Sequence, residues 1–76
     1  MKPKPVKPEK LEKFLYSIGF EKKRQKGSHV FYKHPDGRYT TIPFHKGRVL
    51  SPSLLRQILK EINITVEEYN KKINKL

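Results

Sequence analysis

Residues 24–45 read RQKGSHVFYKHPDGRYTTIPFH, and this stretch decides the fold. Its aromatic and β-branched residues fall into two runs, His29 to His34 and Arg38 to Phe44, which predict two strands. The Pro35-Asp36-Gly37 sequence between them is typical of a tight hairpin turn. A weaker strand pattern, Phe20 to Gln25, precedes them and completes a predicted three-stranded antiparallel sheet.

The pairing of the second and third strands depends on the length of the hairpin loop. A two-residue loop pairs Phe31 with Ile42, whereas a three-residue loop pairs Val30 with Ile42. The two registers turn opposite sets of side chains toward the core, because successive residues of a strand face opposite ways. The sequence leaves both registers open.

Helical patterns lie on either side of the predicted strands. Apolar residues at helical spacing predict one helix from about Pro8 or Glu9 to Ile18 and another beginning at Ser51-Pro52, a hydroxyl cap followed by proline. Thr65-Val66-Glu67-Glu68 matches a capping box and predicts a short third helix through Ile73. The apolar positions are Leu11, Phe14, Leu15 and Ile18, then Leu54, Leu55, Ile58, Leu59 and Ile62. The expected fold is therefore α+β, in the order α-β-β-β-α with a short C-terminal helix.

The composition indicates a polyanionic partner. The 76 residues include 18 Lys and Arg against 7 Asp and Glu, a formal charge of +11, and no cysteine. Such an excess attracts nucleic acids, and the lack of cysteine excludes thiolate chemistry and favours a reducing compartment. Residues 1–8 alternate lysine and proline and are expected to form a flexible basic tail, with 9–76 as a single domain. No apolar stretch suggests a membrane span, so we expect a cytoplasmic protein.

Gly27-Ser28-His29 is the sequence most suggestive of chemistry. An imidazole exchanges protons near neutral pH, and beside a ribose phosphate it can deprotonate the 2′-hydroxyl that attacks the linkage. Arg24 and Lys26 supply nearby positive charge, and the amides of Gly27 and Ser28 can donate to phosphate oxygens. These residues together suggest RNA cleavage at His29. The same tripeptide is also compatible with a simple turn that carries an exposed histidine.

Further residues are candidates for phosphate binding. His45, at the end of the third strand, is expected near His29, where it either shares the acid and base roles with His29 or merely donates a hydrogen bond to phosphate or to backbone. His34 lies at the opposite end of the hairpin and is expected to be structural or exposed. The spacing of the three histidines matches no metal motif, so we expect neither metal nor cofactor. The remaining candidate phosphate-binding residues are Lys46, Arg48 and Arg56, the arginines being favoured by their forked geometry.

The chain resembles the HicA toxin family of bacterial and archaeal toxin–antitoxin systems. The resemblance extends from about Lys10 to Ile73, and its ordered combination of motifs is more specific than any one of them. It differs at the entry to the second helix, where many relatives have glycine-threonine and this chain has Ser51-Pro52-Ser53. The residues that carry it are Arg24-Gln25-Lys26-Gly27-Ser28-His29, His34-Pro35-Asp36-Gly37-Arg38, Ile42-Pro43 followed by His45, and Leu54-Leu55-Arg56-Gln57-Ile58-Leu59.

The resemblance implies a fold like that of the double-stranded RNA-binding domain and a role as the toxin of a type II toxin–antitoxin system. Family members are ribonucleases that cut mRNA, and the histidine of their Gly-Ser-His motif, here His29, is catalytic. A HicB-type antitoxin, acidic where it meets the toxin, is the implied partner of a protein expected to be monomeric alone. The alternative is a noncatalytic double-stranded-RNA-binding module. A DNA-binding module is weaker, because no helix-turn-helix pair is evident.

Overall fold

The computed structural model describes residues 1–45 and 47–76. These residues form the elements α1 (Pro8–Ser17), β1 (Glu21–Lys26), β2 (His29–Lys33), β3 (Tyr39–Pro43), α2 (Pro52–Glu61) and α3 (Val66–Ile73). The predicted α+β class, the order of elements and the short C-terminal helix are confirmed, in an arrangement consistent with the double-stranded RNA-binding-domain fold. None of the described helices combines the length and the apolar character needed to cross a membrane.

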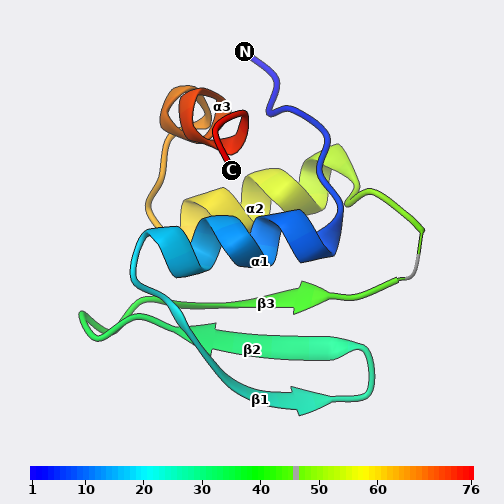
Figure 1. Ribbon diagram of the computed structural model, residues 1–76, viewed down its shortest axis with the longest axis vertical. Helices are drawn as coiled ribbons and strands as arrows, with labels where there is room; N and C mark the ends of the chain where they lie inside the picture. Colours follow the sequence, from blue (N-terminus) through cyan, green and yellow to red (C-terminus); the bar gives the residue numbers. More distant parts are fainter. Residues whose placement is uncertain (46) are drawn as a thin grey trace.

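The three strands form one antiparallel sheet in the order β1-β2-β3, and the helices lie on one side of it (Figure 1). α1 and α2 cover the sheet, and α3 packs on them on the side away from the strands. The other face of the sheet carries no helix in the described part of the chain (Figure 1). The fold therefore has one covered sheet face and one face open to solvent.

The hairpin adopts the register with Val30 opposite Ile42. His34 N–H donates to the Arg38 carbonyl at 2.8 Å, so the loop contains three residues and ends at Gly37, whose φ is +101°. A left-handed residue at the end of a three-residue loop is a common way to close a hairpin, and glycine adopts it without strain. The three-residue alternative is thus the one that the chain adopts.

This register divides the strand residues between the two sheet faces. Val30 and Tyr32 of β2 and Thr40 and Ile42 of β3 are buried under the helices. They meet the apolar stripes of the helices in one core, because the period of two in the strands and the period of 3.6 in the helices each turn one side inward. The helical residues buried in that core are Leu11, Phe14, Leu15, Leu55, Ile58, Leu59, Tyr69 and Ile73.

The N-terminal segment also contributes to the core. Val6 is only 3% exposed, and its carbonyl accepts a hydrogen bond from Leu50 N–H at 2.9 Å. Pro8, the last residue of the expected tail, begins α1 and is buried. The lysine–proline alternation did not predict these contacts, since one valine among eight residues carries no periodicity from which burial can be inferred.

Candidate active site

A two-residue turn presents His29 at the beginning of β2. Lys26 of β1 pairs with His29, and Gly27 and Ser28 connect them. Gly27 has φ +59° whereas Ser28 does not adopt a positive φ, the pattern of a type II′ turn with glycine at its first central position. A Cβ at Gly27 would meet nothing within 4 Å, so the glycine is required by the backbone and not by crowding.

The open face of the sheet holds a row of side chains around His29. Since His29 pairs with Lys26 on one side and Pro43 on the other, all three belong to the same face. The adjacent row contains Arg24, Phe31 and Thr41, which are paired across the strands in the same way. Lys23 is bulged out between Lys22 and Arg24 in β1, and beyond the bulge the pairing continues with an altered register.

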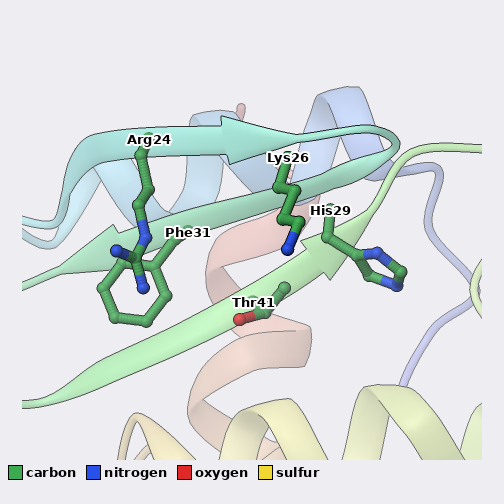
Figure 2. A pocket seen from close by; sticks show the side chains of 5 residues that line it. All are labelled: Arg24, Lys26, His29, Phe31 and Thr41. Atoms are coloured by element: carbon green, nitrogen blue, oxygen red, sulfur yellow. The ribbon is translucent and has the colours of Figure 1, made fainter.

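These two rows enclose a shallow hollow of about 330 Å³, lined by Arg24, Lys26, His29, Phe31 and Thr41 (Figure 2). Arg24 lies over the ring of Phe31, with its guanidinium carbon 5.1 Å from the ring centroid. Lys26 extends across the strands between Arg24 and His29 (Figure 2). As far as the described residues go, this lining contains two permanent cations and no carboxylate, so it suits a phosphate group.

His29 also lines a second hollow, of about 480 Å³, between β3 and α2. His45 and Gln57 are among its other lining residues, and so is Glu61, which accepts a hydrogen bond from Thr40 Oγ1 at 2.7 Å. The end of β3 is held beside the turn by a hydrogen bond from Phe44 N–H to the Ser28 carbonyl at 2.7 Å. His29 is exposed at the boundary of the two hollows, and the first of them is the more favourable to an anion.

Two of the predicted phosphate ligands lie apart from this cluster. Arg56 is exposed on α2, and its guanidinium donates to the Met1 carbonyl at 3.4 Å. Arg48 is exposed in the connection between β3 and α2. Neither is among the residues that line the two hollows beside His29. Lys46, a third candidate, lies outside the described residues.

His34 has a structural environment at the far end of β2. Its Nε2 is 3.1 Å from the Ile18 carbonyl, and its Nδ1 accepts from Asp36 N–H at 3.1 Å. A Cβ on Gly19 would come within 2.7 Å of Nε2, so the ring packs closely against that glycine, whose φ is +98°. His34 therefore links the end of α1 to the hairpin loop.

Sequence reasoning did not select Phe31, Thr41 or Tyr39 as surface residues of the site. Their outward orientation depends on the hairpin register, which the sequence left open. The period of two along β2, which relates Phe31 to His29, is the signal that links them, but it identifies a face only once the register is known. Among the described residues no cluster of three or more potential metal-binding side chains occurs.

The fold and this site together define a small basic α+β protein that presents an exposed histidine between arginine, lysine and aromatic side chains on an open sheet. The family model for the HicA toxin of bacterial toxin–antitoxin systems matches residues 8–64. The chain therefore belongs to the HicA toxin family, and it has an antitoxin partner by that membership. No curated protein gives a significant match to it. The matched region includes all of β1, β2 and β3 but excludes α3 and residues 1–7.

Proposed function

We propose that this toxin is a metal-independent endoribonuclease that cleaves mRNA, with His29 as its general acid or base. The observation that carries the proposal is the position of His29, exposed on a glycine turn and lining one hollow with Arg24 and Lys26. Membership of the toxin family supports the same conclusion. The formal charge of +11 favours rapid capture of RNA over neutral or cationic ligands.

The proposed reaction uses the substrate's own nucleophile. Unprotonated His29 accepts the proton of a 2′-hydroxyl, and the 2′ oxygen forms a bond to the adjacent phosphorus as the bond from phosphorus to the 5′ oxygen breaks. The departing 5′ oxygen takes a proton from an imidazolium or from water. The products are a 2′,3′-cyclic phosphate and a 5′-hydroxyl. His29 acts on the proton, and the protein's cations act on the charge of the phosphate.

The positions of the other polar and cationic groups indicate different roles in binding the RNA. The guanidinium of Arg24 and the ammonium of Lys26 neutralise the phosphate that bridges the cleaved linkage, and the amides of Gly27 and Ser28 are available as further donors. His45 acts from the second hollow, on the phosphate or on the leaving oxygen. Arg48 and Arg56 belong to a more distant basic surface that attracts the RNA chain without touching the reacting linkage, and Lys46 stays a phosphate ligand predicted from the sequence.

The biological setting proposed for this activity is a type II system in the cytoplasm. A HicB-type antitoxin with an acidic contact surface covers the hollow around His29 and excludes RNA. The toxin alone is a monomer and joins a larger complex with its antitoxin. Release of the antitoxin exposes the cationic face and starts cleavage.

The decisive test replaces the imidazole and follows cleavage and binding separately. His29→Ala should lower the cleavage rate of a labelled RNA in the presence of EDTA by about 10²–10⁴-fold, the usual worth of a general acid–base group, while its RNA affinity changes little. The matched substrate control carries a 2′-deoxyribose at the cleaved position, which removes the nucleophile and should block cleavage by the unaltered protein. Circular dichroism checks that the variant is folded.

Three results contradict the proposal. If His29→Ala cleaves as fast as the unaltered protein, or if the 2′-deoxy linkage is cut, the mechanism fails. If the unaltered protein binds RNA and never cuts it, the noncatalytic RNA-binding alternative is correct.

A further inference from the structure

Three side chains on the open face of the sheet form a continuous stack, which we call the stacking ladder: Arg24, Phe31 and Tyr39. The Arg24 guanidinium carbon is 5.1 Å from the centroid of the Phe31 ring. The Phe31 and Tyr39 rings are stacked, with centroids 5.7 Å apart and planes inclined by 30°. Arg24 and Phe31 also line the hollow that contains His29 (Figure 2).

The exposure of Tyr39 is not explained by the packing of the fold. Its side chain is 60% exposed, more than the 46% of Tyr16, the other exposed tyrosine. The helices that bury the core lie on the opposite face of the sheet (Figure 1). The exposed aromatic stack contributes nothing to the core. Because it lies among cations, it points to a ligand with both a flat apolar surface and negative charge.

We propose that the stacking ladder binds unpaired nucleobases of the RNA substrate next to the linkage held at His29, so that the toxin acts on single-stranded RNA. This inference rests on the proposed function and adds the class of RNA on which it acts. Successive bases of single strands stack on aromatic rings and on arginine planes, while neighbouring cations follow the phosphates. Lys26 beside the ladder and Lys33 opposite Tyr39 supply those cations.

The geometry of the strands gives the direction in which the RNA lies. Phe31 follows His29 by two residues along β2, a distance of about 6.6 Å in a strand. Tyr39 pairs with Lys33, one further row in the same direction. The ladder therefore extends from His29 along β2 toward the hairpin loop, and the bases that it holds all lie on one side of the cleaved linkage.

Duplex RNA does not fit this surface. In an A-form helix the faces of the bases are covered by their neighbours in the stack, and only the edges and the backbone are accessible. The flat rings of the stacking ladder make little contact with a base edge or a ribose, whereas they cover the whole face of an unpaired base. The ladder thus distinguishes single strands from duplexes, which phosphate contacts alone do not.

The test measures RNA affinity in the His29→Ala background, in which the RNA remains intact. Fluorescence anisotropy compares a single-stranded oligonucleotide, the same chain with abasic sites, and the same sequence annealed to its complement. Tyr39→Leu should weaken binding of the single strand by about 5- to 150-fold, the usual contribution of one stacked base, and leave the abasic chain nearly unchanged. Tyr39→Phe, which keeps the ring, should retain the affinity, and so should the control Tyr16→Leu.

Any of three results from the RNA affinity measurements overturns the inference. Tyr39→Leu binds the single strand as well as its parent does; it loses equal affinity for the abasic chain, so that bases are not involved; or the duplex binds as tightly as the single strand. If Tyr39→Leu instead weakens only the complex with the antitoxin, the ladder is a protein interface and the inference also fails. Because affinity is measured without catalysis, these results are separate from the cleavage assay, whose failure would contradict the ribonuclease proposal alone.

Discussion

Two fully buried tyrosines illustrate how individual polar groups are accommodated in so small a core. The hydroxyl of Tyr69 donates to the Lys4 carbonyl at 2.7 Å, and that of Tyr32 donates to the Glu12 carboxylate. A buried hydroxyl without a partner would destabilise the fold, so both partners are needed. Burial raises the pKa of Tyr69 to about 12. The pKa of Tyr32 is also raised, mainly by burial and in addition by the hydrogen bond to Glu12.

Tyr69→Phe isolates the contribution of one such hydroxyl. The variant loses a hydrogen bond and should have a free energy of unfolding lower by about 0.5–1.5 kcal/mol near neutral pH, as measured by urea denaturation. The pKa of Tyr69 is raised from 10.0 to about 12 on folding, so the stability that its neutral form contributes is fully present below pH 10. That contribution is lost as the pH rises toward 12, because only the unfolded chain readily releases the proton.

The difference between Tyr69→Phe and the unaltered protein should therefore shrink above pH 10. Tyr39→Phe is the matched control, since the Tyr39 side chain is exposed and its loss of a hydroxyl should leave stability unchanged. An unaltered stability of Tyr69→Phe would show that the hydroxyl of Tyr69 contributes nothing, and a difference that does not vary with alkaline pH would contradict the raised pKa of Tyr69.

The short helix α3 depends on its N-terminal cap and on its packing for stability. It has 8 residues, too few for an isolated helix to persist in water. Thr65 Oγ1 accepts from Glu68 N–H at 3.1 Å, and the Glu68 carboxylate accepts from Thr65 N–H at 3.2 Å. The bond from Thr65 N–H, and after it one from the Thr65 hydroxyl at 2.9 Å, lowers the pKa of the Glu68 carboxyl. The capping box and the burial of Tyr69 and Ile73 together hold the helix on α1 and α2.

Thr65→Ala should reduce the free energy of unfolding by about 0.5–2 kcal/mol, because it removes the side-chain acceptor at the helix N-terminus. Urea denaturation gives the value. Thr65→Ser keeps the hydroxyl and is the control, with a smaller loss expected. If the alanine and serine variants are equally destabilised, the effect comes from the lost methyl group and not from the cap.

At the scale of the whole molecule, the two ends of the chain are joined. Lys4 N–H donates to Asn70 Oδ1 at 2.8 Å, and Asn70 Nδ2 donates to the Lys2 carbonyl at 3.0 Å. The N-terminal segment thus runs from α1 to α3, and both termini lie on the side of α1 and α2 away from the sheet (Figure 1). Both partners of this contact lie outside the region that matches the family model. They stabilise the helical side of the fold, away from His29.

Val6→Ala tests whether this segment contributes to global stability. The side chain is 3% exposed, so removing two methyl groups should lower the free energy of unfolding by about 1–2 kcal/mol. RNA cleavage by the folded variant should remain unchanged, because Val6 is buried in the core and lines neither of the hollows beside His29. Val49→Ala is the matched control: its side chain is 54% exposed, and its stability should change by less than about 0.5 kcal/mol. Equal effects of the two substitutions would mean that the N-terminal segment does not stabilise the core.

Local features of the chain were predictable because their causes are local. Ser51 and Thr65 cap helices as predicted, since a hydroxyl before a helix satisfies an amide only three residues away. Gly27 and Gly37 adopt the positive φ that their turns require. The N-terminal contacts of Val6 were not predictable, because its partner Leu50 is distant in the sequence and is not marked by any periodic pattern.

The amino-acid sequence by itself determined which segments are helices and strands, and it predicted His29 as the candidate residue for proton transfer. Backbone preference and apolar spacing act over a few residues, so they can be read from the chain directly. Only the tertiary structure decided that Val30 faces Ile42, and with it that Phe31 and Tyr39 stack on the face of the sheet that carries His29. The physical reason is that register is selected by loop closure and core packing together, and a shift of one residue would exchange the two faces of the strand.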